Sequence, residues 1–162
     1  MSRKKNMIPA HGRNARRPAR VRKPRYLVVC GGQVTEPQYF RHLKSKNDDI
    51  AIDVKVKVLS PLGLANYAVR CKKDDDAKSD SGSRYAAVFV VVDVDDFHDH
   101  KEAQTICSEN DIHLIISNPC FEVWLIDHIQ ECPSSCATTK AAEQYASTHK
   151  VTTGSRDILI LM

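Results

Sequence analysis

Two aspartates near the middle of the chain carry the clearest chemical signal in the sequence. Asp93 and Asp95 follow directly after the apolar run of residues 88–92, and one residue separates them. Residues two apart in an extended chain point to the same side, so both carboxylates can share a hard cation such as Mg²⁺ or Mn²⁺. We therefore expect a metal site at the end of a buried strand, and metal-assisted phosphoryl transfer is the chemistry that such a site supports.

The residues around these aspartates also allow simpler interpretations. The acids could merely solvate a loop at the end of the strand. His98 and His100 follow closely, and together with the aspartates they have acceptable ligand types for zinc or manganese. Histidines in flexible loops are more often exposed to solvent, so we favour a site with oxygen ligands.

The elements that must position the aspartates alternate between strand and helix patterns. The predicted strands cover residues 26–30, 52–58, 86–92 and 112–116, and the predicted helices cover residues 35–46, 64–73, 101–110, 120–130 and 138–149. This alternation predicts an α/β fold with a single domain, in which four mainly parallel strands carry helices on both faces. The carboxyl ends of such strands share one edge of the sheet, where ligands bind in open α/β folds.

Three polar segments should meet at this edge: the turn after the first strand, the aspartates after the third, and residues 117–119 after the fourth. Ser117 and Asn118 carry hydrogen-bond donors for a phosphate of a nucleic acid, although Asn118 and the following proline could equally only initiate a helix. Glu122 lies in the first turn of that helix. It either reaches the site as a further metal ligand or stabilises the positive end of the helix dipole.

Other expectations concern structure alone. Thr35 can cap the helix after the first strand, and Trp124 falls on the core face of its helix. Residues 74–83, DDDAKSDSGS, read as a polar loop that lacks the ligand spacing of a calcium-binding EF-hand. Cys132 and Cys136 have no second pair for a zinc site, and we expect all six cysteines to be free thiols.

The N-terminal segment differs sharply in composition from the remainder. Residues 1–25 hold ten Lys and Arg residues and no acid, which leaves 14 basic and 20 acidic residues for the rest. Residues 1–24 contain few large apolar side chains, so we expect a disordered basic arm. The arm either binds nucleic acid phosphates or only keeps the protein soluble. Its candidate contacts are Arg16, Arg17, Arg20, Arg22 and Lys23.

Length and hydropathy exclude some classes of protein. The 162 residues suffice for one domain with an adequate core. No apolar run approaches the ~20 residues that cross a bilayer, and the basic N-terminus lacks the apolar stretch of a secretory signal. We expect a cytoplasmic protein without membrane contact, and the oligomeric state stays open.

Three sequence blocks, VVCGGQVTEPQYF, VVDVDDF and SNPCFEVWLIDH, follow one another over about residues 25–128. In their sequence and order they resemble the RloB-like family, whose members are often found with bacterial restriction and phage-defence loci. The family is similar to the wider Toprim group of topoisomerases, primases and OLD-family nucleases. This resemblance implies a compact Toprim-like α/β domain, here over residues 25–150. It also implies a Glu after the first strand and a DxD motif after the third, which together hold Mg²⁺ for phosphodiester chemistry.

Carried onto this sequence, the resemblance assigns Asp93 and Asp95 to the DxD motif. The family's first block usually reads Cys-Glu-Gly, and here the expected Glu, a general base or metal partner, is Gly31. Glu36, one helical turn further along, is the candidate to replace it as a catalytic residue. Residues 151–162 do not resemble the family's usual ending, which indicates an atypical or truncated tail.

Two functions follow from these residues. In the first, the protein is a Mg²⁺-dependent, nuclease-like component of a bacterial phage-defence or abortive-infection system, with nucleic acid as its substrate and a protein of that system as its partner. In the second, it is a catalytically inactive relative that binds nucleic acid or protein. The sequence does not distinguish DNA, RNA and nucleotides as ligands.

Overall fold

The computed structural model describes residues 22–78, 80, 82–94 and 97–152 of the chain. Several residues with predicted roles lie outside these ranges: Arg16, Arg17, Arg20 and Asp95, together with the tail after residue 152. Arg22 and Lys23 are described and exposed. In the described part of the chain, no helix combines the length and the apolar character that crossing a membrane requires.

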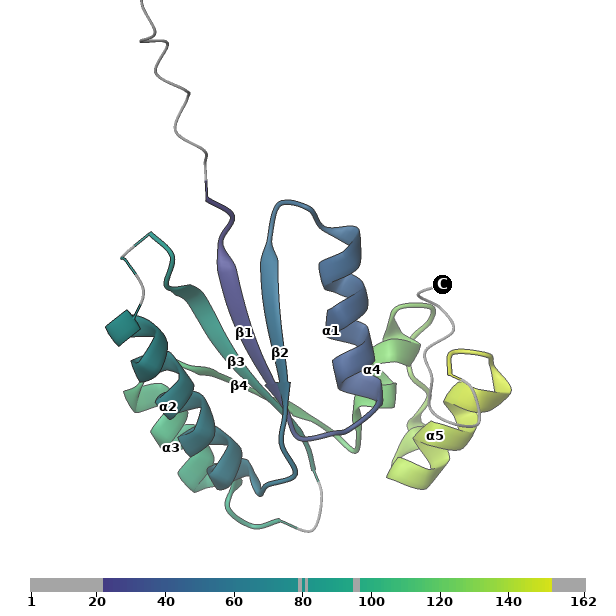
Figure 1. Cartoon of the computed structure of the whole chain (residues 1–162). Helices are drawn as coiled ribbons and strands as arrows, with labels where there is room; N and C mark the ends of the chain where they lie inside the picture. Colours follow the sequence, from purple (N-terminus) through teal and green to yellow (C-terminus); the bar gives the residue numbers. More distant parts are fainter. Residues whose placement is uncertain (1–21, 79, 81, 95–96, 153–162) are drawn as a thin grey trace, which may run out of the picture.

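A four-stranded sheet forms the centre of the molecule (Figure 1). Its strands are β1 (Arg25–Cys30), β2 (Ala51–Val56), β3 (Tyr85–Asp93) and β4 (His113–Ser117), in the spatial order β2-β1-β3-β4. All neighbouring pairs are parallel. The predicted α/β fold is confirmed, and its mainly parallel sheet proves wholly parallel. The two continuous apolar runs form the central strands β1 and β3. Helices cover both faces of these strands, so apolar side chains are buried on both sides.

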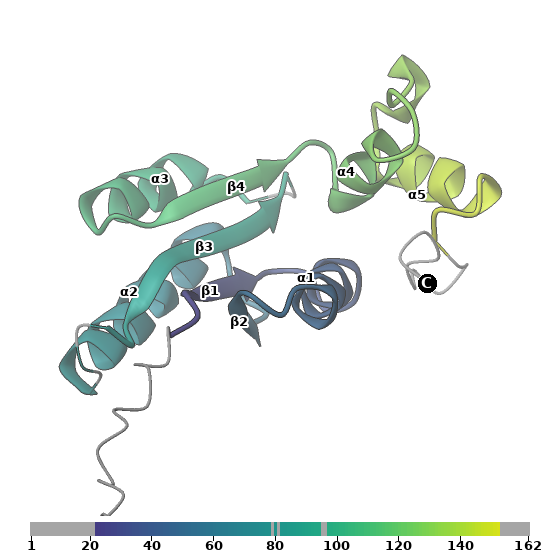
Figure 2. The same ribbon diagram turned by 90° about the horizontal axis from the view of Figure 1, so that it is seen from above.

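Helices cover both faces of the sheet, as predicted (Figure 2). The helices are α1 (Thr35–Lys46), α2 (Pro61–Lys78), α3 (His100–Glu109), α4 (Phe121–Asp127) and α5 (Thr139–Thr148), with a short 3₁₀ helix, η1 (Ser134–Cys136), before α5. Helices α2 and α3 cover one face, and α1, α4 and α5 lie on the other. Alternate residues of β1 divide between these two cores. Val28 and Cys30 pack on the side of α4, and Leu27 and Val29 pack on the side of α2.

The order of the strands creates a crevice at the carboxyl edge of the sheet. From β1 the chain passes through α1 to β2, and from β2 it returns through α2, on the opposite face, to β3. The loops after β1 and β3 therefore leave toward opposite faces. Such a topological switch point is where open α/β sheets bind their ligands.

Helix α2 is longer than its sequence pattern indicated. It continues to Lys78, so the prediction of a polar loop was wrong for residues 74–78. Asp75 accounts for the difference. Its carboxylate accepts hydrogen bonds from the Arg25 guanidinium at 3.1 Å and from the Tyr85 backbone N–H at 2.9 Å, which fixes the end of the helix against β1 and β3.

Arg25 joins four elements at the amino edge of the sheet. Besides Asp75, its guanidinium donates to Asp53 Oδ2 at 3.0 Å and lies over the Tyr85 ring, whose hydroxyl also donates to Asp53 at 2.9 Å. Burial alone would raise the pKa of Asp53, but the hydrogen bonds from Arg25 and Tyr85 outweigh it and hold that pKa below its usual value. The amino edge is therefore closed by a charged cluster, whereas the carboxyl edge remains open.

Trp124 lies at the surface, and its assignment to the core was wrong. Its side chain is 49% exposed and packs edge-on against His128, with ring centroids 4.9 Å apart. Phe121 and Leu125 supply the core face of α4 instead. The helix ends at Asp127, too early for the longer apolar stripe that the sequence suggested.

Candidate functional site

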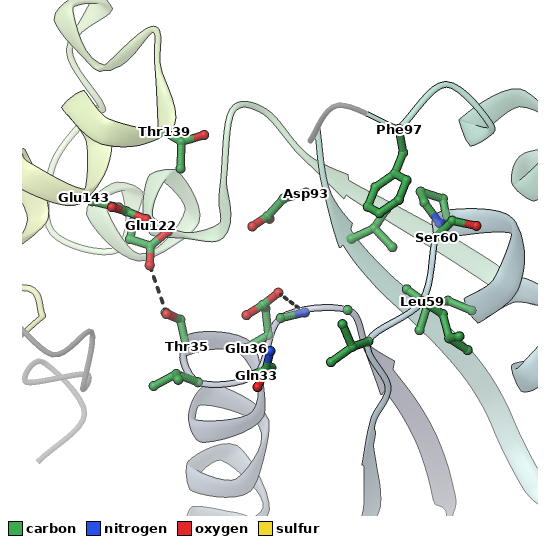
Figure 3. A pocket seen from close by; sticks show the side chains of 17 residues that line it. Gln33, Thr35, Glu36, Leu59, Ser60, Asp93, Phe97, Glu122, Thr139 and Glu143 are labelled. Carbon is green, nitrogen blue, oxygen red and sulfur yellow. Dashed lines mark hydrogen bonds between the residues drawn. The ribbon is translucent and has the colours of Figure 1, made fainter.

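A cavity of about 700 Å³ lies at the switch point, between the carboxyl ends of β1 and β3 (Figure 3). Its walls come from the loops after β1 and β2, the end of β3, and the N-terminal parts of α1, α2, α4 and α5. A concave site of this size is the default place to look for ligand binding. Among the described residues its lining includes four carboxylates and no Lys, Arg or His. The carboxylates are those of Glu36, Asp93, Glu122 and Glu143.

Asp93 is the last residue of β3. Val91 packs into the core on the side of α4, so Asp93, two residues later, is directed to the same face. In Figure 3 its carboxylate extends into the space that Glu36 and Glu122 also face. The structure therefore places Asp93 in the wall of the cavity, and its role as a metal ligand stays a prediction.

Glu36 lies in the first turn of α1 and is buried. Its Oε1 accepts a hydrogen bond from the Gly32 backbone N–H at 3.0 Å. A Cβ at position 32 would overlap the Glu36 carboxylate, so glycine leaves the room that this contact occupies. The bond holds Glu36 against the loop after β1, at the edge where the resemblance expects a carboxylate.

Glu122 is fixed by a contact between two distant helices. Thr35 Oγ1 donates a hydrogen bond to Glu122 Oε1 at 2.9 Å, and both side chains are buried. The prediction that Thr35 caps α1 was wrong, because Thr35 is the first helical residue and its hydroxyl bonds to α4 instead. A buried carboxylate needs such a donor to replace lost water. The bond joins α1 to α4 and makes Glu122 part of the cavity wall.

A comparison of the sequence with protein families agrees with the resemblance to RloB-like proteins. The sequence model described as RloB-like protein matches residues 26–157, a range that contains the strands and helices around the cavity. The chain belongs to the RloB-like family. No curated protein and no solved structure matches it. The relation of this RloB-like domain to Toprim proteins and to phage defence stays a prediction.

Gly31 stands where the resemblance to RloB-like proteins predicts the glutamate of Cys-Glu-Gly, and this difference from the family stays a prediction. The Gly31 N–H donates to the Val91 carbonyl at 3.0 Å and so continues the pairing of β1 with β3. A Cβ built here would lie 3.1 Å from Leu64 Cδ1, on the side of α2. A side chain at position 31 would therefore start from the wall that adjoins α2, while Asp93 is directed to the face of α4.

The oxygen donors of the cavity suit a hard cation. Within the described ranges, no three His, Cys, Asp or Glu side chains form a ready-made metal cluster. Mg²⁺, however, is commonly held by one or two carboxylates, with water and substrate phosphate completing its octahedron. Asp93 with Glu36 meets this lower requirement, whereas Asp95 lies outside the described residues. His98 is exposed, and His100 Nε2 contacts the Asp93 backbone carbonyl at 3.3 Å rather than lining the cavity.

Two buried cysteines beside the cavity are poor nucleophiles. Burial, with a smaller contribution from Glu36, raises the pKa of Cys30 to about 12. Burial and a hydrogen bond to Glu122 also raise the pKa of Cys120. Both thiols therefore stay protonated at neutral pH, and neither is expected to act as a nucleophile.

Ser117 and Asn118 lie along a separate, mainly apolar hollow of about 390 Å³ between β4, α1 and α4. The Ser117 carbonyl accepts the Val94 N–H at 2.9 Å, so this segment braces the chain just after β3. Arg22 and Lys23 come just before β1, whose amino end lies at the opposite edge of the sheet from the cavity. The nucleic-acid contacts proposed for these four residues stay predictions.

Glu143 and Phe97 line the cavity, and the sequence predicted a functional role for neither of them. Glu143 comes from α5, and nothing in the local pattern of that helix distinguishes it from a solvated acid. Phe97 had a usable signal, because it is a large apolar side chain within the polar segment DVDDFHDH. An aromatic residue there has no predicted strand or helix to bury it.

Proposed function

We propose that this RloB-like protein is a metal-dependent phosphodiesterase that acts on nucleic acid, as a nuclease-like component of a bacterial phage-defence or abortive-infection system. The observation that carries the proposal is the shared cavity of Asp93, Glu36 and Glu122 at the switch point. The described residues of the cavity wall carry carboxylates and no Lys, Arg or His. Such a wall repels the negative charge of a phosphodiester unless a metal ion binds with it. The N-terminal parts of α1, α2 and α5 border the same cavity and favour an anion there.

The residues divide into three roles under this proposal. Asp93, together with Asp95, would hold the Mg²⁺ or Mn²⁺, which when bound would polarise the phosphate and lower the pKa of a water molecule. Glu36, oriented through Oε1 by the Gly32 N–H, would accept the proton of the attacking water. Glu122, oriented by Thr35, would complete the acidic wall as a further ligand, directly or through water.

Cleavage assays on single- and double-stranded DNA and RNA, each with Mg²⁺, Mn²⁺ or EDTA, test the proposal. We expect metal-dependent cleavage that Asp93→Asn reduces by about 100-fold or more, since the contribution of a bound metal is several kcal/mol. Asp48→Asn is the matched control, because Asp48 is exposed in the turn before β2. Cleavage that survives Asp93→Asn, or that persists in EDTA, would contradict the proposed site.

A second function is favoured by a specific observation. Position 31, where the resemblance predicts a glutamate, holds a glycine. The carboxylates of Glu36 and Glu122 already hold local structure through hydrogen bonds from Gly32 and Thr35. These hydrogen bonds stabilise the fold and do not depend on catalysis. A protein that binds nucleic acid or a defence-system protein, and that cleaves no substrate, would therefore keep them. Absence of cleavage together with nucleic-acid binding that weakens steeply with salt would support this second function, because such binding releases counterions.

A further inference from the structure

The acidic cavity has a second wall of opposite character. Val58, Leu59 and Phe97 line it, and all three are exposed large apolar side chains, with Phe97 45% exposed. Figure 3 shows Leu59 and Phe97 across the cavity from Glu122 and Glu143. A soluble protein seldom gathers exposed apolar groups without a use, and such groups beside a polar site mark a ligand surface.

The described residues Val94 and Asp99, on the two sides of Phe97, are each held by hydrogen bonds. Before it, the Val94 N–H donates to the Ser117 carbonyl at 2.9 Å. After it, Asp99 Oδ2 accepts hydrogen bonds from Ser60 Oγ at 2.6 Å and from the Leu62 N–H at 3.3 Å. The bond from Ser60 is also the main cause that lowers the pKa of Asp99, so the anchor is a carboxylate at neutral pH. Phe97 therefore lies between two residues, Val94 and Asp99, that are tied to β4 and to the start of α2.

A ligand that satisfies both walls needs an anionic group that binds through a metal ion and a flat apolar group close to it. A nucleotide has both, in its phosphate and its base. The size of the cavity, about 700 Å³, lies within the range of small-ligand sites. Aromatic side chains bind bases by stacking on the face of the ring, which is available in an unpaired nucleotide and covered in a duplex.

We propose that the cavity binds an unpaired nucleotide, with its base stacked on Phe97 beside Leu59 and its phosphate at the carboxylate wall around Asp93. The substrate class is then single-stranded nucleic acid, and a free mononucleotide shares the same recognition chemistry. This inference rests on the proposed function, because the phosphate end needs the metal ion. It adds a base-binding residue that the metal chemistry does not require.

Equilibrium binding of a fluorescein-labelled ten-nucleotide single strand, its duplex and unlabelled dTMP tests the proposal. Fluorescence anisotropy in Ca²⁺, another oxygen-ligated cation, reports binding separately from turnover. We expect the single strand to bind at least tenfold more tightly than the duplex. Phe97→Ala should weaken single-strand binding by about 5- to 150-fold, the range for loss of one stacked base.

Three further variants make the test specific. Phe97→Tyr keeps the ring and should bind within about twofold of the wild type, whereas Phe97→Leu keeps an apolar side chain and should lose affinity as Phe97→Ala does. Ile129→Ala is the matched control, because Ile129 is also an exposed apolar residue and does not line the cavity. If dTMP competes with the strand and depends equally on Phe97, a mononucleotide suffices as ligand.

The outcomes separate this inference from the proposed function. Equal single-strand affinity of the wild type, Phe97→Ala and Phe97→Leu would overturn the base site, even if metal-dependent cleavage is found. Duplex binding as tight as single-strand binding would overturn it as well. Phe97-dependent binding without any cleavage would support the base site and reject the nuclease. Calorimetric titration of the protein with Mn²⁺ alone should give the same affinity for Phe97→Ala as for the wild type.

Discussion

Replacing Gly31 by glutamate restores the carboxylate that other RloB-like sequences are expected to carry. The new Cβ would lie 3.1 Å from Leu64 Cδ1 and 3.5 Å from the Val91 carbonyl oxygen. The tighter contact falls on the end of a flexible side chain, so Leu64 can move by a few tenths of an ångström. We expect a cost of about 1 kcal/mol in the free energy of unfolding, at the lower end of the range for overpacking. Loss of a glycine from the unfolded chain offsets about 0.4–1 kcal/mol of it. Gly31→Ala should therefore unfold in urea within about 1 kcal/mol of the wild type.

The added charge should matter more than the added volume. Two unit charges 4 Å apart interact by about 1 kcal/mol in water and about 4 kcal/mol near a protein surface, and a divalent cation doubles this. We therefore expect Gly31→Glu to bind Mn²⁺ at least about tenfold more tightly than the wild type, a difference of about 1.4 kcal/mol. Isothermal titration calorimetry measures it, with Gly31→Gln as a control of the same shape without the charge. If folded Gly31→Glu binds Mn²⁺ no more tightly than Gly31→Gln, position 31 does not belong to the metal site. Increased nucleic-acid cleavage by Gly31→Glu would show that the site had lost a catalytic carboxylate.

Three further predictions follow from the hydrogen bonds and the pKa values. Thr35→Val should lower the free energy of unfolding by about 1.5–3 kcal/mol in urea, because the buried Glu122 carboxylate loses its donor. Arg25→Met should lower it by about 1–2 kcal/mol at pH 7, a value reduced for the partial exposure of the pair with Asp53. Because the pKa of Asp53 is lowered in the folded protein, this contribution is present above the usual pKa near 3.9 and is lost as the pH falls through the lower folded value. The raised pKa of Cys30, about 12, gives the opposite dependence. The contribution of the protonated Cys30 thiol to the stability of the fold is complete below about pH 8.5 and is lost as the pH rises toward 12. Alkylation of Cys30 by iodoacetamide at pH 8 should therefore be slow in the native protein and fast in urea.

Each of these predictions has a matched control. Thr105→Val removes an exposed hydroxyl that donates to a backbone carbonyl, and it should change the stability by less than about 0.5 kcal/mol. Arg70→Met removes an arginine from the exposed side of α2 and should show little dependence on pH. Cys71 is only partly buried and should be alkylated before Cys30, as mass spectrometry of the digested protein would show. A Thr35→Val variant as stable as the wild type would contradict the role given to the bond between α1 and α4.

The sequence was most informative where local pattern and topology coincide. The apolar runs around Val28 and Val90 indicated central strands, and the parallel order that follows from alternation placed Asp93 at the carboxyl edge. Contacts between distant segments left no such trace. Thr35 and Glu122 are 87 residues apart, and only the packing of α4 beside α1 makes them partners.

The same reason explains the other differences between sequence and structure. Residues 74–78 look like a solvated loop until Asp75 meets Arg25, and this tertiary bond outweighs the local propensity. Trp124 has the spacing of a core residue, but α4 is short and lies at the end of the sheet, so its outer side stays open to solvent. Phe97 belongs to no periodic pattern because it lies outside the helices and strands.

The charged cluster of Arg25, Asp53, Asp75 and Tyr85 has a consequence for substitutions at the cavity. It secures β1, β2, α2 and β3 at the edge of the sheet farthest from the carboxylate cavity. A substitution at position 31, at the opposite edge, leaves the contacts of this cluster unchanged. Variants such as Gly31→Glu can therefore test the cavity on a scaffold whose amino edge they do not touch.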